Sequence, residues 1–376
     1  MVGSFASVTI NTMANPTARD NRLSDLDLLR FGAAVAVTLY HYVSCYPSAE
    51  DSEAASLSLI NAVTRYGYLG VDLFFMISGF VILWSSINRD ALGFAISRAS
   101  RLFPSFWVSI VFAAVWIAIF AESVARFEAP PLDFRTFAAN ATMVPAVFDA
   151  PLIEGVYWTL EIEARFYALI FLLLLFRQLH RIEVFLWTWL VVSIVALFVD
   201  LPWALHYLAL VPYGPFFIAG CFLFLVRSAG LTSSRLAALL VSAGICAYIS
   251  IEQRGGFITP DPLSAYITPC LVLAFFALLA WIALRAPSET APSPIAYSLG
   301  ALTYPLYLTH ATMGLLLYEI LRPHVGVAWT LATMCALALI VAWVMTTLVD
   351  IPARKPFANL LYRCANAAGL KPATGS

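Results

Sequence analysis

Seven ionisable side chains lie inside long apolar stretches of this 376-residue sequence: Arg30, His41, Asp72, Glu161, Glu163, Arg165 and His310. A charge within hydrocarbon costs at least about 2.5–3.5 kcal/mol, so each of these residues is a functional candidate. An imidazole beside carboxylates can take up and release a proton, and a guanidinium group can hold a phosphate. The residue types therefore suggest proton transfer on a substrate that is held in part by its negative charge.

Arg30 and His41 are expected on one face of a single helix. Their separation of eleven residues leaves them about 20° apart, with a rise of roughly 16 Å along the axis. That rise is about half of the ~30 Å hydrocarbon core. One helix would thus carry a permanent cation at one level and a titratable imidazole at another. Arg30 could instead snorkel to the interface, and His41 could simply pack against a neighbouring helix.

Four titratable side chains are expected at a similar depth, in the outer half of a bilayer. His41 comes late in an outward-running segment, and His310 lies past the middle of another. Asp72 and Glu163 come early in segments that run inward. The common height predicts one site, although Asp72 could also be a solvated carboxylate at a helix end.

Glu161 and Arg165 are four residues apart and are expected to neutralise each other as an ion pair. Glu163 points roughly to the opposite side, so it needs a partner on another helix or a water-filled cavity. Arg98 and Arg101 are neighbours on one helical face, at the level of Arg30. Together they could hold a phosphate-rich ligand, but basic residues at this side of a membrane also arise without any ligand.

The composition restricts the class of protein. Hydrophobic residues make up 61% of the chain and charged residues only 11%, whereas soluble domains carry roughly 25% charged residues. The net charge of -1 provides no basic field for a nucleic acid. The six cysteines show neither a disulfide framework nor metal-ligand spacing, so no metal is expected. An ordinary cytosolic enzyme, a disordered chain and a nucleic-acid binder are excluded, and an all-α polytopic membrane protein is predicted.

About ten transmembrane helices are predicted from runs of roughly 20 apolar residues. They lie near 26–45, 66–87, 102–121, 156–176, 182–199, 205–226, 236–251, 264–284, 295–319 and 327–349. The stretch 136–148 is too short to span and is expected to be re-entrant or interfacial. Most arginine and lysine side chains fall in one alternate set of connections, so both termini are expected in the cytoplasm.

Three regions are expected: a polar N-terminal tail (1–24), a transmembrane domain (25–357) and a cytoplasmic C-terminal tail (358–376). Residues 1–25 show no basic start followed by a short apolar core, so no signal peptide is expected. The protein is expected to be a multi-pass membrane protein.

Several short motifs follow one another along nearly the whole chain. They are Arg30-x10-His41, Gly70-Val71-Asp72-Leu73-Phe74-Phe75, Ser78-Gly79-Phe80, Arg98-x2-Arg101-Leu102-x-Pro104, Tyr157-Trp158-Thr159-Leu160 with Glu163, Tyr304-Pro305-Leu306-Tyr307-Leu308 before His310, and Asp350-x-Pro352-x-Arg354. In this order they resemble the membrane-bound acyltransferase-3 family. Glu161 departs from the family pattern, which usually has a small residue there.

The resemblance implies transfer of an acyl group, most often acetyl, from cytoplasmic acyl-CoA to a hydroxyl of an extracytoplasmic saccharide or glycolipid, of the O-antigen or exopolysaccharide type. Its partners would be acyl-CoA, the acceptor and membrane lipids, with no nucleic acid, metal or separate cofactor. The site residues inferred with it are catalytic His41, Asp72 and Glu163, acyl-CoA-binding Arg30, Arg98 and Arg101, and substrate-binding Trp158, Tyr304 and His310.

In this mechanism His41 is the general base, and Asp72 or Glu163 orients its ring or binds sugar hydroxyls. A transient acyl-histidine stays open, whereas a serine or cysteine nucleophile has no support because no G-x-S-x-G motif occurs. Buried ionisable residues would equally suit a proton-coupled transporter or a flippase of a lipid-linked sugar. A scaffold subunit of a glycan assembly complex is a third possibility.

Overall fold

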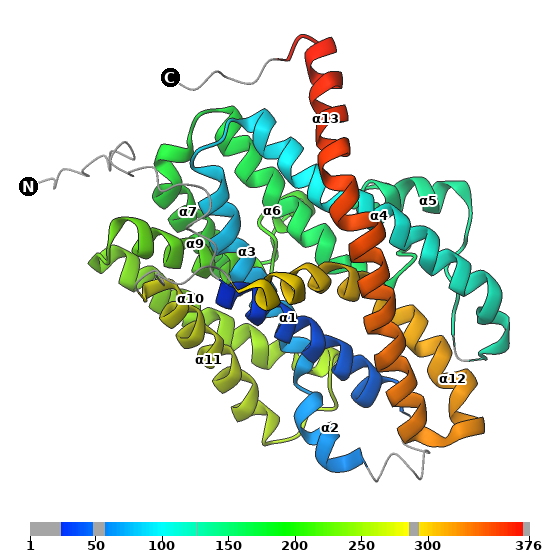
Figure 1. Cartoon of the computed structure of the whole chain (residues 1–376). Coiled ribbons are helices and arrows are strands. Elements are labelled where there is room, and N and C mark those ends of the chain that lie inside the picture. The colour runs from blue at the N-terminus through cyan, green and yellow to red at the C-terminus, as the bar shows by residue number, and fades with distance from the viewer. Residues whose placement is uncertain (1–23, 48–56, 126, 286–292, 371–376) are drawn as a thin grey trace, which may run out of the picture.

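The computed structural model describes residues 24–47, 57–125, 127–285 and 293–370, and every regular element in these ranges is a helix (Figure 1). The α-helices are α1 (Ser24–Leu39), α2 (Ser58–Thr64), α3 (Gly70–Ser86), α4 (Ala91–Phe120), α5 (Phe134–Ala141), α6 (Trp158–Leu175), α7 (Ile182–Val195), α8 (Trp203–Leu208), α9 (Gly214–Ala229), α10 (Ser233–Gln253), α11 (Ser264–Leu284), α12 (Pro294–Met345) and α13 (Ile351–Ala367). Two π-helices, η2 (Tyr40–Cys45) and η10 (Thr346–Asp350), follow α1 and α12.

The bundle has two ends, the α13 end and the α2 end. Helix α13 projects from one end, at the top of Figure 1, and α2 lies at the other. The α13 end also carries the α3–α4 and α6–α7 connections. Helix α3 lies in the middle and packs against α9, α1 and α6, while α1 packs along α12.

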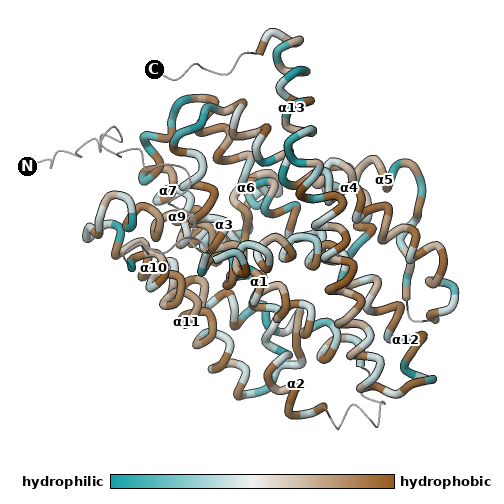
Figure 2. The backbone as a smooth tube through the Cα atoms, viewed as in Figure 1, coloured by the Kyte–Doolittle hydropathy of each residue, from teal (hydrophilic) through white to brown (hydrophobic). Residues whose placement is uncertain are grey.

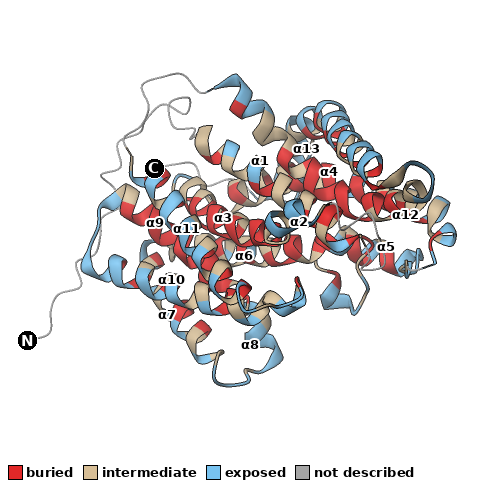
Figure 3. Ribbon diagram, turned by 90° about the horizontal axis from the view of Figure 1, so that it is seen from below, coloured by how far each residue is buried: buried red, intermediate tan, exposed pale blue. Residues whose placement is uncertain are grey.

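The outer faces of the bundle are apolar. Large apolar side chains such as Val111, Trp281 and Trp329 are more than half exposed. Figure 2 shows apolar residues dominating the body, and Figure 3 shows that buried residues lie inside a shell of exposed helix faces. Exposed apolar faces of this extent require a lipid surround, so the chain is a multi-pass membrane protein.

The predicted helical bundle is confirmed for the described residues, whereas the number of ten spans stays a prediction. Six helical segments are long and apolar enough to cross a membrane. Helix α6 carries three charged residues, and α7 and α9 are short. The predicted N-terminal tail (1–24) lies outside the described residues except for Ser24, and so do residues 371–376 of the predicted C-terminal tail, so the positions of both termini also stay predictions.

Three boundaries differ from the sequence-based expectation. The predicted span 205–226 is two helices, α8 and α9, because the chain turns at 209–213. The predicted C-terminal tail continues α13 as far as Ala367. The stretch 136–148 forms α5 and a single 3₁₀ turn, Pro145–Phe148. In each case the apolar composition indicated burial but not where the helix stops.

Helix α12 consists of two legs, 294–325 and 327–345, joined at Gly326. Gly326 has a φ of 75°, a left-handed conformation that a residue with a Cβ adopts at a cost. This glycine therefore allows two of the predicted spans, 295–319 and 327–349, to follow each other almost without a loop.

Helices α3 and α9 approach each other at two glycines. A Cβ atom on Gly220 would lie 1.9 Å from the Met76 carbonyl oxygen, and one on Gly79 would lie 2.1 Å from the Phe217 carbonyl oxygen. Small residues at such crossings let two membrane helices pack backbone to backbone. The contact holds α3 in place, and α3 carries residues of the site described below.

Replacing Gly220 by alanine is expected to destabilise the bundle, because neither backbone can yield to the added Cβ. Overpacking of this kind costs about 1–3 kcal/mol of the free energy of unfolding. The thermal unfolding midpoint of Gly220→Ala in detergent should fall clearly below that of the unchanged protein. Gly244→Ala is the matched control, because a Cβ there meets nothing within 4 Å; its midpoint should not fall. Equal midpoints for both variants would contradict the close crossing.

Candidate active site

Two histidines from distant parts of the chain are hydrogen-bonded to each other. The Nδ1 atom of His41 lies 3.0 Å from Nε2 of His310, and the ring of His310 is completely buried. His41 stands in the π-helix η2, where one extra residue per turn shifts its side chain from the ideal helical position. Such π-turns are frequent at functional sites.

The surrounding carbonyl groups assign the protons of this histidine pair. Nδ1 of His310 lies 3.1 Å from the Leu306 carbonyl oxygen and 3.0 Å from that of Tyr307. Carbonyl oxygens only accept, so His310 carries its proton on Nδ1 and presents a lone pair at Nε2. His41 then donates from Nδ1, which leaves its own Nε2 with a lone pair. His41 is thereby held in the tautomer that can accept a proton at Nε2.

A cavity of about 170 Å³ surrounds His41 and is called the histidine cavity here. Aromatic side chains line much of it, namely Tyr40, Tyr68, Trp158, Phe257 and Tyr307. The hydroxyl of Tyr307 lies 2.7 Å from that of Thr159, and Tyr40 donates to the Phe257 carbonyl. These bonds fix the positions of two of the wall side chains.

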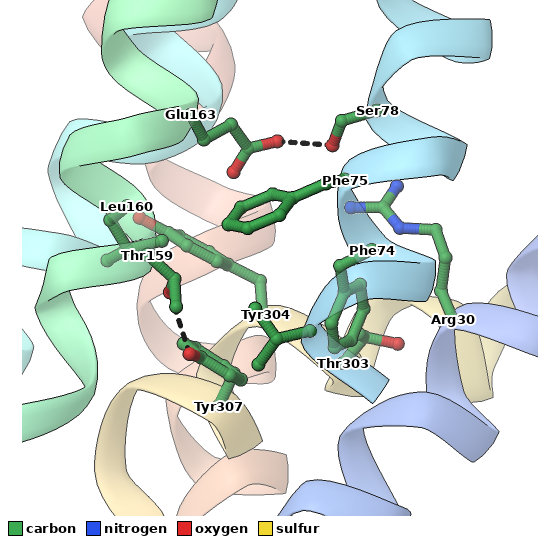
Figure 4. A pocket seen from close by; sticks show the side chains of 11 residues that line it. Arg30, Phe74, Phe75, Ser78, Thr159, Leu160, Glu163, Thr303, Tyr304 and Tyr307 are labelled. Carbon is green, nitrogen blue, oxygen red and sulfur yellow. Dashed lines mark hydrogen bonds between the residues drawn. The ribbon is translucent and has the colours of Figure 1, made fainter. Parts of the chain in front are cut away.

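A second cavity, the arginine cavity, adjoins the first, and Figure 4 shows the side chains that line it. It holds only about 50 Å³ and is lined by Arg30, Ser78, Glu163, Tyr304, Thr159 and Tyr307, among others. Val71 and Tyr307 line both the arginine cavity and the histidine cavity. The two spaces are therefore neighbours with a common wall of two side chains.

The third space, the outer mouth, opens at the α2 end and holds about 820 Å³. Tyr40 and Phe257 line both the outer mouth and the histidine cavity. Its rim is polar, because Arg65 forms a 2.8 Å salt bridge with Asp261 and also donates to the Thr259 carbonyl. The three spaces form a row along the bundle with His41 in the middle one.

Arg30, Arg98 and Arg101 gather at the α13 side of the row. Arg98 and Arg101 both lie within electrostatic range of Arg30, which lines the arginine cavity. Nε of Arg98 is buried without a hydrogen-bond partner. Within the described ranges no salt bridge reaches any of the three, whereas four other arginines each have a carboxylate partner: Arg65, Arg235, Arg285 and Arg354. Glu163, which lines the arginine cavity with Arg30, lies within electrostatic range of Arg98. Three guanidinium groups thus face one carboxylate, a surplus of positive charge that suits an anionic ligand.

Residues 23–347 match a family model described as an acyltransferase domain. The chain belongs to this acyltransferase family. It is also 33% identical over 102 residues to "Acyltransferase MdmB" of Streptomyces mycarofaciens. That match covers 27% of this chain and 26% of the relative, so the chain aligns with only about a quarter of that protein's length. No solved structure matches the chain. The resemblance inferred from the motifs is thus confirmed at the level of the family.

The acyltransferase brings together two of the four titratable side chains that were expected to meet, His41 and His310. Glu163 lies in the arginine cavity instead, where Ser78 donates to its carboxylate over 2.7 Å and Tyr167 also donates (Figure 4). Asp72 is buried, and its electrostatic neighbours include Tyr68, Tyr213 and Cys246. Neither carboxylate is hydrogen-bonded to His41 in the described chain, because equal height on different helices does not imply facing directions.

The remaining predicted residues lie where a substrate could reach them. Trp158 lines the histidine cavity, and Tyr304 lines the arginine cavity with its hydroxyl donating to the Leu102 carbonyl.

Glu161 and Arg165 do not form the simple ion pair that their spacing predicts. Instead Tyr207 joins them: its hydroxyl donates to Glu161 over 3.0 Å, and its carbonyl accepts from Arg165 over 3.0 Å.

The sequence did not predict the residues that bond to the backbone at and after His310. Tyr42 donates to the His310 carbonyl over 3.0 Å, and Glu154 accepts from the Thr312 N–H over 3.0 Å. Glu154 precedes α6, and its burial raises the pKa of the carboxyl group to about 7. The available signal was the Tyr42-x3-Tyr46 spacing directly after His41. Tyr46, one turn after Tyr42, donates to the Ala311 carbonyl.

Among the described residues no group of three or more His, Cys, Asp or Glu side chains is arranged to hold a metal ion.

Proposed function

We propose that this acyltransferase moves an acyl group, expected to be acetyl, from acyl-CoA to a hydroxyl of an extracytoplasmic saccharide or glycolipid. The α13 end faces the cytoplasm and the α2 end faces outward from a bacterial inner membrane. One observation carries the proposal: His41, with a lone pair at Nε2, lies between an open polar mouth and three guanidinium groups that have no salt bridge among the described residues.

The orientation rests on the distribution of basic residues. Arg89, Arg177, Arg181, Arg227 and Arg354 all lie in or beside connections at the α13 end. Cytoplasmic connections carry such an excess of basic residues. The acyl donor, which is cytoplasmic, then reaches the arginine cluster first.

The donor has the right length for this path. The pantetheine arm of acyl-CoA has twelve bonds between its phosphate oxygen and its sulfur, equivalent to four extended residues or about 13–14 Å. Arg30 and His41 are separated by a rise of roughly 16 Å. With its pyrophosphate at the arginine cluster, acyl-CoA can therefore bring the thioester close to Nε2 of His41 through the arginine cavity.

His41 acts as the general base. Nε2 takes the proton of the acceptor hydroxyl while the hydroxyl oxygen attacks the thioester carbonyl carbon. The C–S bond then breaks, and the proton passes from Nε2 to the leaving thiolate of CoA. His310 keeps the other proton of His41 on Nδ1 throughout, because its own Nδ1 proton is held by helix carbonyls and its Nε2 can only accept.

The acceptor enters from the outer mouth. Phe257 lines both this mouth and the histidine cavity, and it stacks on Tyr68 of the histidine cavity with ring centroids 4.7 Å apart. Aromatic faces of this kind suit the apolar face of a sugar ring. Polar groups at the rim, including Arg65 and Asp261, suit its hydroxyl groups. A saccharide is thereby favoured over an apolar alcohol.

The direct experiment measures release of the CoA thiol by the purified protein in nanodiscs. Acetyl-CoA and a panel of saccharide acceptors are supplied, and mass spectrometry reads the acetylated product. Thiol release that depends on the acceptor is expected. Neither thiol release nor product with any acceptor in the panel would contradict the proposed function.

His41→Ala is expected to reduce the rate of acyl transfer by about 10²–10⁴-fold, the usual contribution of a general base. The variant should still insert and accumulate, because His41 is only partly buried. His324→Ala is the control, since this histidine is exposed and far along α12. Transfer by His41→Ala at the rate of the control would remove His41 from the chemistry.

His310 is expected to act as a positioning residue, and two substitutions separate that role from packing. Leucine removes the acceptor at Nε2, frees the tautomer of His41 and should lower kcat by about 10²–10⁴-fold with little change in the KM for acetyl-CoA. Glutamine can offer an amide oxygen at the same place and should recover most of kcat. Equal kcat values for His310→Leu and His310→Gln would contradict the tautomer assignment.

Arg101→Gln is expected to raise the KM for acetyl-CoA about 10–100-fold, because a hydrogen bond to a charged group contributes about 1.5–3 kcal/mol. The effect on kcat should be much smaller, since Arg101 does not reach the reacting atoms. Arg363→Gln, at an exposed position on α13, serves as the control. An unchanged KM for Arg101→Gln would exclude Arg101 from donor binding.

A further inference from the structure

A separate cavity of about 570 Å³ lies at the α13 end, between the α3–α4 connection and the α6–α7 connection. Leu92, Phe171 and Leu174 provide an apolar floor, and the nitrogen-bearing side chains of Arg89, Arg177 and His180 line it as well. The carboxylate of Asp90 also lines the cavity, but it caps α4 by accepting from the Gly93 N–H over 2.9 Å. An apolar floor with basic side chains is suited to a flat aromatic base that carries phosphate.

Arg177 adds an independent observation, because its backbone is strained. It has a φ of 55° and ends α6 in a Schellman motif, in which the Gln178 N–H donates to the Leu173 carbonyl and the Arg177 N–H to that of Leu174. Glycine usually takes this left-handed position, and other residues adopt it at a cost. A strained arginine in the wall of a cavity points to a ligand that uses its side chain.

The position of this cavity fits the far end of the acyl donor. Arg98 lies within electrostatic range of both Arg89, in this cavity, and Arg30, in the arginine cavity. Helix α6 lines both spaces, and Phe171 follows Glu163 by eight residues, a rise of about 12 Å. The guanidinium group of Arg98 thus lies within electrostatic range of one arginine in each of the two cavities.

We propose that the cavity lined by Arg89, Phe171 and Arg177 binds the 3′-phosphoadenosine end of acyl-CoA. The adenine lies on the apolar floor at Phe171, and Arg89 and Arg177 bind the 3′-phosphate. The pyrophosphate then lies at Arg98, and the arm continues into the arginine cavity. This inference rests on the proposed function and adds a specificity for the nucleotide portion of the donor.

The test compares acetyl-CoA with acetyl-dephospho-CoA, which lacks only the 3′-phosphate. The unchanged protein should use acetyl-CoA with a kcat/KM at least about tenfold higher, and Arg177→Gly should reduce that ratio to near one. The same variant should unfold at an unchanged or higher temperature, because glycine relieves the left-handed backbone. Arg363→Gln, the exposed control, should keep the full ratio.

Several outcomes would overturn the inference. They are equal use of both donors by the unchanged protein, retention of the full ratio by Arg177→Gly, or a ratio that follows the anionic lipid content of the nanodisc, which would indicate a lipid headgroup instead. Equilibrium binding of adenosine 3′,5′-bisphosphate tests the cavity without turnover and should weaken at least tenfold in Arg177→Gly. If neither donor is turned over but this binding holds, the proposed function fails while the nucleotide site stands.

Discussion

The hydrogen bond between His41 and His310 is the interaction on which the site depends. Two helix carbonyls hold the proton of His310 on Nδ1, and that proton decides which nitrogen of His41 can accept one. A chain of bonds therefore runs from the backbone of α12 to Nε2 of His41, the atom that is proposed to take the proton. Carboxylates usually orient a catalytic imidazole, but the imidazole proposed as the base is here bonded to a neutral ring, which adds no second charge to the membrane interior.

The arginines of this protein, which has few charges, fall into two groups according to whether they have a partner inside the protein. Most of them are satisfied internally, as in the Arg235–Glu183 salt bridge or the donation from Arg165 to the Tyr207 carbonyl. Those of the cluster around Arg30 have no salt bridge in the described chain, and the carboxylate near them, Glu163, accepts hydrogen bonds from Ser78 and Tyr167. A charge in such surroundings is retained only where a partner compensates it, so the cluster supports the proposal of an anionic ligand.

The features that could be predicted from the sequence alone are those that apolar periodicity encodes. It located helices, the common level of His41 and His310, and the separation of Arg30 from His41 along α1, because rise along a helix is fixed. It could not locate Asp72, because height says nothing about the direction in which a side chain faces. The π-turn at His41 and the Tyr207 bridge depend on neighbouring helices, so no local pattern revealed them. The approach of α3 to α9 at Gly220 could be suspected only after pairing the helices.

The dimensions of the row of cavities favour an enzyme over a carrier of sugars. The outer mouth is wide, but the arginine cavity holds about 50 Å³, little more than one water molecule in liquid. A saccharide would have to displace Tyr304 and Tyr307, whose hydroxyls are bonded to the Leu102 carbonyl and to Thr159. The pantetheine arm of acyl-CoA is a flexible chain with side groups no larger than methyl, hydroxyl and carbonyl, so it needs a narrower opening than a saccharide. In the proposed reaction the acceptor and the donor thus enter from opposite sides and meet at His41, and only the acyl group passes from one to the other.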